Sequence, residues 1–296
     1  MSIEFQSVGI IGTHQNPHVS DTVFELWQFL NELNIQTFIE KETHKDFPNK
    51  NQLKAYSHKE IAENCDLAII VGGDGNFLNA GRILSSFKEI PITGINRGKL
   101  GFLTDINPDD IKTRLFNLLK GYYKCEKRFI LNAEVIKNND SIGKITAVNE
   151  IVLSSGHNSR LFEFSVRIDN QEAFSQRSDG MIIATPTGST AHALSAGGSI
   201  LYPNLNAIEL VPMYPHSLTS RPIVISADST IEITIGSYNN PTPLISHDGH
   251  CFSDLLPKDK IIIKKDDTYL KILHPKDYNY YQTLRHKLHW SKLLFE

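Results

Sequence analysis

The sequence predicts a doubly wound, mostly parallel α/β domain at the N-terminus, followed by a β-rich domain of antiparallel, sandwich-like layers. Three observations support this fold class. The 296 residues exceed one ordinary domain and give each of two domains enough chain to bury its own core. The first 125 residues alternate apolar strand-like runs with helical patterns, and after about Gly121 short runs of period two dominate.

Residues 1–125 contain the expected βαβ elements in order. After the strand-like run 8–11, apolar residues recur at helix spacing from Val23 to Leu33, with Ser20 as the expected N-cap. Further strands are expected at 35–39, 67–71 and 91–95, and a helix at about 111–119. The run 67–71 is apolar throughout, as in a strand covered on both faces, which favours parallel pairing.

Residues 126–275 form the predicted second domain. Alternating runs at 161–168 and 231–235, and a short apolar run at 261–263, predict antiparallel strands packed as layers, with one helix near 190–195. The tail 276–296 again has apolar residues at helical spacing. We expect this tail to pack back onto the first domain or onto a partner chain.

Composition excludes several classes of protein. Lys and Arg total 30 against 33 Asp and Glu, so the overall charge does not favour binding to nucleic acid or to an anionic membrane. The three cysteines are far apart and form no C-x-x-C pair, which fits a reducing compartment. The first residues have no basic segment before their apolar run, and no apolar stretch approaches the ~20 residues of a membrane helix. A cytoplasmic protein is expected.

The segment Gly72-Gly73-Asp74-Gly75-Asn76 is the first candidate site, because it follows a buried strand and precedes a helix. Its backbone amides can approach phosphate oxygens closely, and the helix N-terminus favours anions. Asp74 beside a phosphate would have to accept a hydroxyl proton or help to hold a cation. A plain Asp-Gly turn is the alternative. No P-loop motif and no strand-linked G-x-G-x-x-G is present.

A second candidate is TPTGSTA at 185–191, followed by Ala196-Gly197-Gly198. Its hydroxyls and helix-terminal amides could bind a diphosphate together, and the small side chains would leave room for a ligand. The alternative is an N-capped helix followed by a turn. A run this rich in small and hydroxyl residues favours the ligand site.

Two polar pairs complete the candidates. Asn149 and Glu150 interrupt an apolar strand, and an Asn amide matches the edge of adenine while a Glu carboxylate accepts from ribose hydroxyls. Taken alone, a bulge or strand end with both side chains in solvent is the better interpretation. Arg177 and Asp179 precede a buried-looking strand and could either form a surface turn or face a cleft.

With these residues in place, the sequence resembles the bacterial NAD kinases, the ATP-NAD kinase family, over almost its whole length. The motifs are jointly very specific. The matching blocks are GGDGN (72–76), INRGKLGFLTD (95–105), NEIVL (149–153), SQRSDG (175–180), TPTGSTA (185–191), LSAGG (194–198) and SRPIV (220–224).

The resemblance implies an enzyme that transfers the γ-phosphoryl group of ATP, with Mg²⁺ or Mn²⁺, to the 2′-hydroxyl of the adenosine ribose of NAD. It also implies a homotetramer in which NAD is held between domains and chains. Asp74 would be the catalytic proton acceptor, and Gly72, Gly73, Gly75 and Asn76 would bind phosphate. The implied NAD-binding residues are Asp74, Gly75, Asn149, Glu150, Arg160, Arg177, Asp179, Thr190, Ala191, His192, Ala193, Leu194, Ser195 and His250.

Two positions depart from the commoner family pattern. His192 stands where relatives usually carry Tyr, and His250 where many carry Gln. His192 is expected to lie against a base or nicotinamide. The pair His247-x-x-His250 is weak evidence for a metal site, and a turn at Asp248-Gly249 is the better interpretation.

Two other functions remain open from the sequence. A lipid kinase of the diacylglycerol or sphingosine type resembles this family in a glycine-rich Asp motif, but has little use for TPTGSTA, LSAGG and the Asn-Glu pair. An NAD-binding sensor would keep the pocket without requiring Asp74.

Overall fold

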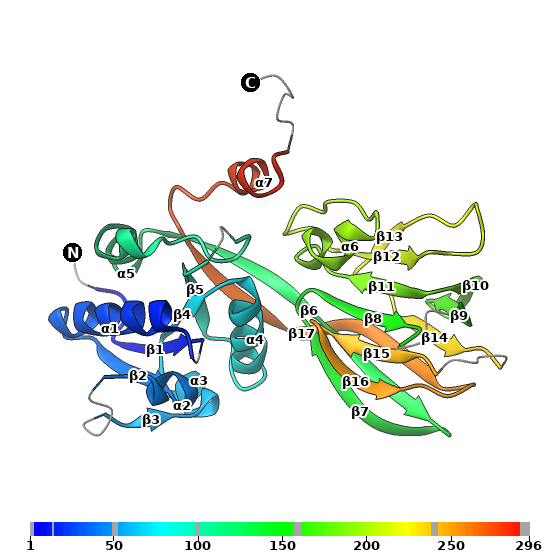
Figure 1. Cartoon of the computed structure of the whole chain (residues 1–296), viewed down its shortest axis with the longest axis horizontal. Coiled ribbons are helices and arrows are strands. Elements are labelled where there is room, and N and C mark those ends of the chain that lie inside the picture. The colour runs from blue at the N-terminus through cyan, green and yellow to red at the C-terminus, as the bar shows by residue number, and fades with distance from the viewer. Residues whose placement is uncertain are drawn as a thin grey trace. The chain divides into compact units, whose positions relative to one another are not determined.

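A computed structural model describes residues 3–13, 15–48, 53–98, 101–156, 161–237 and 242–290. The chain divides into two compact units, which Figure 1 shows with the elements labelled. Unit 1 comprises residues Met1–Lys127 and Leu270–Glu296, and unit 2 comprises Arg128–Tyr269. Strands β6 (Tyr123–Lys137) and β17 (Lys260–Pro275) run from one unit into the other.

Unit 1 is built on a parallel sheet. Its strand order is β17-β5-β4-β1-β2-β3, and the neighbouring strands in this series all pair in parallel. The strands that lie wholly in this unit are β1 (Ser7–Gly12), β2 (Gln36–Glu40), β3 (Ala55–Tyr56), β4 (Leu67–Gly72) and β5 (Pro91–Asn96). Chain order and sheet order differ as expected for a doubly wound fold, because β2 lies on one side of β1 and β4 on the other.

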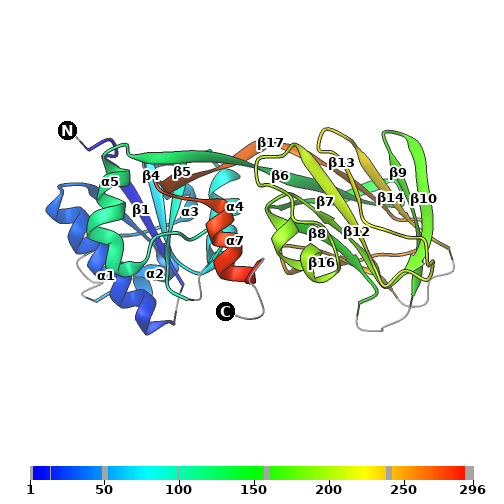
Figure 2. The same ribbon diagram turned by 90° about the horizontal axis from the view of Figure 1, so that it is seen from above.

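Helices cover both faces of this sheet, and Figure 2 shows α1 and α5 on one side of the strands and α3 and α4 on the other. The helices are α1 (Pro17–Glu32), α2 (Lys41–Lys45), α3 (His58–Asn64), α4 (Asp74–Ser85), α5 (Phe116–Leu119) and α7 (Tyr280–Leu288), with a 3₁₀ turn Pro108–Asp110 and a π-helical turn Ile111–Leu115 before α5.

The prediction of Ser20 as the N-cap of the first helix is wrong. The cap is Asn16, and Pro17 stands in the first turn, where its missing amide hydrogen costs nothing. Ser20 lies inside the helix and donates its hydroxyl to the Asn16 carbonyl at 3.3 Å. Proline at the start of a helix is therefore the boundary signal that the sequence offers here.

Successive residues of β1 point to opposite faces of the sheet, and apolar packing on both faces explains why helices cover both. Val8 and Ile10 belong to the core cluster that contains the apolar face of α1 and the residues around α5. Gly9 points to the other face, where a Cβ atom would stand 2.4 Å from the Ile61 side chain of α3. Glycine therefore lets α3 approach the sheet closely.

Unit 2 consists of two antiparallel sheets. One has the strand order β13-β12-β11-β8-β15-β16, and the other contains β10-β9-β14-β17 with β6 and β7. These strands are β7 (Asp140–Ala147), β8 (Glu150–Ser154), β9 (Phe162–Ile168), β10 (Gln171–Ser178), β11 (Gly180–Ala184), β12 (Ala207–Met213), β13 (Ile223–Ser226), β14 (Ile231–Ile235), β15 (Leu244–His247) and β16 (His250–Asp254); α6 (His192–Ser195) and a 3₁₀ turn Gly188–Thr190 follow β11.

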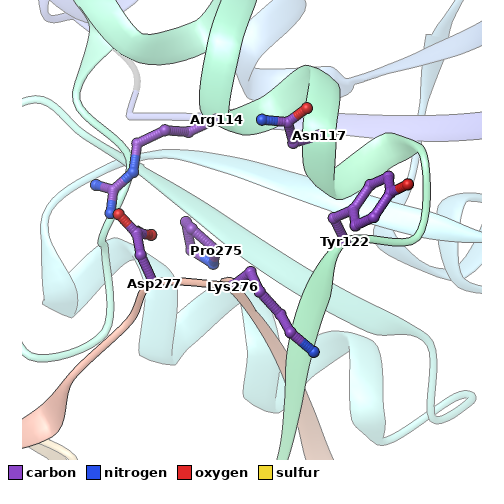
Figure 3. A pocket seen from close by; sticks show the side chains of 6 residues that line it. All are labelled: Arg114, Asn117, Tyr122, Pro275, Lys276 and Asp277. Carbon is purple, nitrogen blue, oxygen red and sulfur yellow. Dashed lines mark hydrogen bonds and ion pairs between the residues drawn. The ribbon is translucent and has the colours of Figure 1, made fainter.

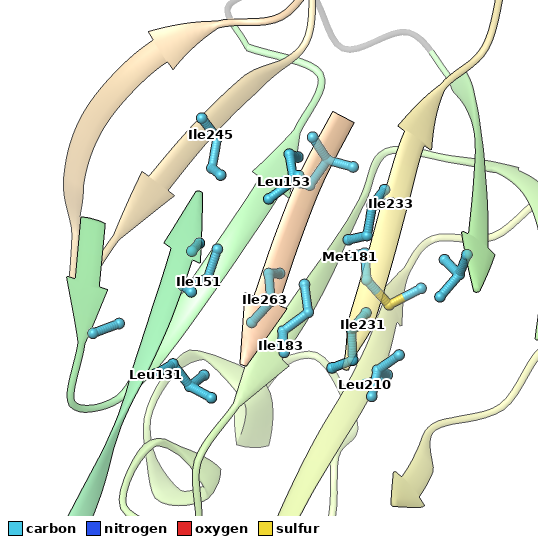
Figure 4. Packing of buried hydrophobic residues seen from close by; sticks show 14 of the residues in the cluster. Leu131, Ile151, Leu153, Met181, Ile183, Leu210, Ile231, Ile233, Ile245 and Ile263 are labelled. Atoms are coloured by element: carbon cyan, nitrogen blue, oxygen red, sulfur yellow. The ribbon is translucent and has the colours of Figure 1, made fainter. Parts of the chain in front are cut away.

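The core of unit 2 lies between these two sheets. Ile151 and Met181 come from one sheet and Ile231 and Ile263 from the other, and all four belong to one buried apolar cluster (Figure 4). The inward residues alternate with outward ones, as in the burial of β9 and β14. The predicted fold class is thus confirmed. Among the described residues, no helix combines the length and apolar character needed to cross a bilayer.

Candidate active site

The GGDGN segment lies at the carboxyl end of β4, beside the end of β1. The chain leaves β1 toward β2 on one side and β4 toward β5 on the other, so this is the switch point where open α/β sheets bind ligands. Gly72 has φ +152°, and a Cβ atom there would lie 2.9 Å from Thr13 Oγ1. Gly73 is the N-cap of α4, and Asp74 is its first residue.

Four hydrogen-bond donors surround the Asp74 carboxylate. Oδ2 accepts from the Phe102 amide at 2.7 Å and from Lys287 Nζ at 3.2 Å. Oδ1 accepts from the Leu103 amide at 3.2 Å and from Thr104 Oγ1 at 3.4 Å. The loop after β5 and the C-terminal helix α7 therefore both hold this carboxylate.

Close packing makes the position of the carboxylate specific. A Cβ atom on Gly101 would stand 1.9 Å from Asp74 Oδ1 and 2.7 Å from Thr104 Oγ1, so only glycine lets the loop close around the acid. Thr104 is fully buried. The Asp74 side chain keeps 23% of its surface exposed. A buried loop thus presents a partly exposed carboxylate at the end of the sheet.

The two other glycines of the motif leave space. Cβ atoms added at Gly73 or Gly75 would meet none of the described residues within 4 Å. Packing against these residues does not require glycine at either position, whereas a phosphate approaching the first turn of α4 would. The Asn76 side chain donates to the Val71 carbonyl at 3.2 Å, so a contact from Asn76 to phosphate would fall to its backbone amide.

In unit 2, Glu150 is the first residue of β8 and Asn149 precedes it, so the pair stands at a strand end, as the alternative interpretation placed it, and does not interrupt the strand. The reason is Asp248, whose carboxylate accepts from the amides of Val148 (2.9 Å), Asn149 (2.8 Å) and Glu150 (3.3 Å). Asp248 and Gly249 form the turn between β15 and β16, both with positive φ.

Glu150 is buried, with 6% of its surface exposed. The alternative that places both polar side chains in solvent is therefore wrong for this residue, whereas Asn149 is half-buried. Glu150 Oε2 is buried and has no hydrogen-bond partner among the described residues. Burial, and then the neighbouring charge of Asp248, raise the pKa of Glu150 to about 7.

The TPTGSTA loop packs directly against this strand start. The Thr185 amide donates to the Asn149 carbonyl at 2.9 Å, and Thr185 Oγ1 donates to the Val148 carbonyl at 2.6 Å. Ser189 Oγ donates to the Pro186 carbonyl at 2.7 Å and accepts from the Leu201 amide. Both residues are fully buried, so these two of the four hydroxyls in the segment are not available to the predicted diphosphate. They fix the loop instead.

The residues of the following segment, 190–195, differ in their exposure to solvent. Ala193 is buried and packs in a small apolar cluster with Ile182 and Val211. His192 and Ser195 are exposed, and Thr190, Ala191 and Leu194 are partly exposed. The polar members of this segment therefore face outward from the buried loop.

Arg177 and Asp179 are not brought together with Glu150 within one chain. In the pairing of β11 with β8, Gly180 lies opposite Ser154 and Ala184 lies opposite Glu150. Four residues of strand separate the two ends by about 13 Å. Arg177 is exposed, as is His250 at the start of β16, and Arg160 lies outside the described residues.

Several residues of the two sites could not be found from the sequence. Asp248 looks like an ordinary Asp-Gly turn, and two of the four donors to Asp74 are backbone amides, which carry no residue signature. Lys287 lies 213 positions from Asp74 in the chain. Its place on a helical tail expected to pack back on the first domain was the only available signal.

The described residues contain no group of three or more His, Cys, Asp or Glu side chains that could hold a metal ion. Mg²⁺ at phosphoryl-transfer sites is commonly held by one or two carboxylates together with substrate phosphates. Asp74 alone, next to space for phosphate, fits that kind of site.

A pocket of about 340 Å³ elsewhere in unit 1 contains none of the predicted residues. Figure 3 shows Arg114, Asn117, Tyr122, Pro275, Lys276 and Asp277 around it. Arg114 and Asp277 form an ion pair at 2.6 Å, so its two facing charges already satisfy each other. The pocket gives no indication of a ligand.

Two family models match the chain. The ATP-NAD kinase N-terminal domain matches residues 8–123, and the ATP-NAD kinase C-terminal domain matches residues 148–274. The matched segments include the Asp74 region and the Glu150 region respectively.

Relatives of known name agree with these models. The chain is 44% identical to an NAD kinase of Pseudoalteromonas translucida and 45% identical to one of Shewanella oneidensis, over 295 residues that cover all of each chain. None of these matches supports the lipid-kinase alternative.

Solved structures have the same fold. A yeast NADH kinase complexed with NADH has a TM-score of 0.89 at 24% identity, with 99% of this chain and 93% of that one covered. An NAD kinase from Archaeoglobus fulgidus in complex with ATP has a TM-score of 0.71 at 25% identity, with 95% and 99% covered.

Proposed function

Because this chain belongs to the ATP-NAD kinase family, we propose that it transfers the γ-phosphoryl group of ATP to the 2′-hydroxyl of the adenosine ribose of NAD, with Asp74 as the proton acceptor. The observation that carries the role of Asp74 is its carboxylate, fixed by the Phe102 and Leu103 amides at the end of β4. Phosphoryl transfer needs mainly positioning and electrostatic stabilisation, and a group held by backbone donors is already positioned.

Glu150 and Asn149 would recognise the adenosine half of NAD. A buried carboxylate oxygen without a donor is costly, and two ribose or amine hydrogens of a nucleoside would supply what Glu150 lacks. Exposed His192 is the residue of its segment available to lie against a base, while Ala193 is committed to packing. Thr190, Ala191, Leu194, Ser195, Arg160 and His250 are proposed as further contacts on the family resemblance.

Arg177 and Asp179 would act from a neighbouring copy. They lie at the end of β11 remote from Glu150, about 13 Å along the strand, too far to share one ribose with it. A homo-oligomer, a tetramer as the resemblance implies, would let one copy supply this pair to the nucleoside held by the other copy's Glu150.

The divalent cation would enter with ATP, as Mg²⁺ or Mn²⁺ bound to the phosphates, and would offset charge on them. Gly73 and Gly75, whose surroundings are open, would admit those phosphates to the first turn of α4. We place the enzyme in the cytoplasm, because its three cysteines are all free, as a reducing compartment keeps them.

The direct test is formation of NADP from NAD and Mg·ATP by the purified protein. We expect turnover with the native chain, and failure to form NADP with retained NAD binding would favour the sensor instead.

A mixture of Glu150→Gln and Asp179→Asn variants tests whether two copies of the chain contribute residues to one NAD site. Mixed oligomers should recover activity beyond the sum of the two variants, and no recovery after co-refolding would contradict the contribution of a second copy.

A further inference from the structure

The acceptor capacity of the Asp74 carboxylate is already filled. An ionised carboxylate has about four lone-pair sites, two on each oxygen. Phe102 and Lys287 occupy Oδ2, and Leu103 and Thr104 occupy Oδ1. A substrate hydroxyl that gives its proton to this carboxylate must first hydrogen-bond to it. One of the four donors therefore has to leave before the reaction.

Only one of these donors can leave without dismantling the loop. Phe102 and Leu103 donate from the backbone of a buried segment, and the Thr104 side chain is fully buried. Lys287 donates from the end of a flexible side chain that keeps 33% of its surface exposed. Its ammonium also lies 4.9 Å from the centre of the Phe102 ring, a second contact that holds it beside the loop.

The same ammonium is attracted to the group that must arrive. The donor triphosphate carries several negative charges, and Lys287 is a strongly solvated point charge on a four-carbon stem that can follow them. We infer that Lys287 is a further catalytic residue, which covers Asp74 in the resting enzyme and moves to the oxygens of the donor phosphates when ATP binds. This inference rests on the proposed function.

The exchange fits the charge balance of the reaction. The 2′-oxygen bonds to the γ-phosphorus as the bond from that phosphorus to the bridging oxygen of ADP breaks, and the hydroxyl proton passes to Asp74. Lys287 would remove its positive charge from the proton acceptor and place it where negative charge is transferred. Both effects favour the forward step.

Lys287→Met tests the inference because it keeps the length and removes the charge, and Lys287→Arg keeps the charge. We expect the Met variant to raise KM for ATP and to lower kcat, by about 10- to 100-fold in kcat/KM, with KM for NAD unchanged. The Arg variant should recover much of the activity. Arg285→Ala is the matched control, because it removes a positive charge from an exposed position of α7. It should behave like the parent.

A binding measurement distinguishes two roles of Lys287, a contact with the ATP phosphates and a purely structural support of Asp74. In the Asp74→Asn background, Lys287→Met should still weaken the affinity for a non-hydrolysable ATP analogue by about tenfold or more. Unchanged analogue affinity there, or unchanged KM for ATP in the single variant, would overturn the inference even if kcat fell. A native chain that forms no NADP would instead refute the proposed function, while the analogue measurement would still decide the role of Lys287.

Discussion

The two functional carboxylates of this chain are held in opposite ways. Asp74 in unit 1 has four donors and keeps 23% of its side chain exposed. Glu150 in unit 2 is only 6% exposed, has an oxygen that finds no hydrogen-bond partner in the part of the chain that the structure describes, and faces the charge of Asp248. One acid is complete without substrate, and the other is not.

This difference separates two kinds of work. A group that acts in the transition state benefits from donors that fix it beforehand, and for Asp74 these are the loop donors Phe102, Leu103 and Thr104, which would remain when Lys287 leaves. A group that recognises a ligand can instead lack a hydrogen-bond donor in the free protein. A ligand whose hydroxyl donates to that group then binds more tightly than a ligand that lacks the hydroxyl. Asp74 has the first character and Glu150 the second.

The largest expected effect follows when Asp74 loses its basicity. Asp74→Asn keeps the shape but cannot take a proton, so kcat should fall on the order of 10²-fold or more. NAD affinity should stay near that of the parent, because Asn keeps the shape of the side chain and the basicity of Asp74 is needed mainly in the transition state. Steady-state kinetics with calorimetry of NAD binding measure both. Near-normal turnover would show that the donors around Asp74 serve structure only.

Displacing Asp74 without changing its chemistry should have the next largest effect. In Gly101→Ala the new Cβ atom would meet Asp74 Oδ1 at 1.9 Å, so the carboxylate or the loop must shift. Misplacement by about 1 Å can cost up to about 10²-fold, and we expect kcat to fall about 10- to 100-fold.

Gly98→Ala is the control for that substitution. It lies in the same loop, and among the described residues its Cβ atom would meet Asn96 Oδ1 alone, at 3.8 Å. This variant should retain the parent kcat. Equal losses in the two glycine variants would assign the effect to general disturbance of the loop.

Glu150→Gln should act on binding more than on turnover. The amide is a poorer acceptor for a ribose hydroxyl, which costs roughly 1 to 3 kcal/mol, or about one to two decades in NAD affinity. The expected result is a raised KM for NAD with a smaller change in kcat. Unaltered NAD affinity in calorimetry would mean that the partnerless oxygen does not meet the ligand.

The sequence could predict the two fold types because apolar periodicity carries them. The run 67–71 and the alternation at 231–235 both correspond to strands, β4 and β14, within a residue at each end. It could also mark Asp74 as a candidate acid between glycines, whereas for Glu150 the residues alone favoured a solvent-exposed side chain and only the family resemblance gave it a role. Those inferences need only residue types and their order.

What holds the two acids could not be predicted. The donors of Asp74 are two amides and a threonine hydroxyl of a loop and a lysine of the last helix, and amides are the same in every residue. The capture of three amides by Asp248, which moves the start of β8 to Glu150, is likewise long-range. The hydroxyls of Thr185 and Ser189 misled for the same reason, since a buried structural hydroxyl and a ligand-binding one look alike in sequence.

The smallest expected effect concerns stability. It tests, without substrate, whether the buried Glu150 oxygen lacks a hydrogen-bond partner in the free protein. Its pKa is about 7 in the folded chain and near 4.5 when unfolded, with burial as the main cause. Between these values the native state binds more protons than the unfolded state, so stability falls as pH rises from about 4.5 to about 7. The full penalty, on the order of 1 to 3 kcal/mol, is present above that range.

Glu150→Gln should remove this slope. Urea unfolding of unit 2 at pH 5 and pH 8 should show similar stability of parent and variant at pH 5, and a more stable variant at pH 8, by up to about 3 kcal/mol or a few degrees in Tm. Taking the difference between the two proteins cancels the other titrating groups. Saturating NAD should reduce the difference at pH 8, because ribose donors favour the ionised acid in the parent. The same difference at both pH values would show that Glu150 already has its partners in the free protein.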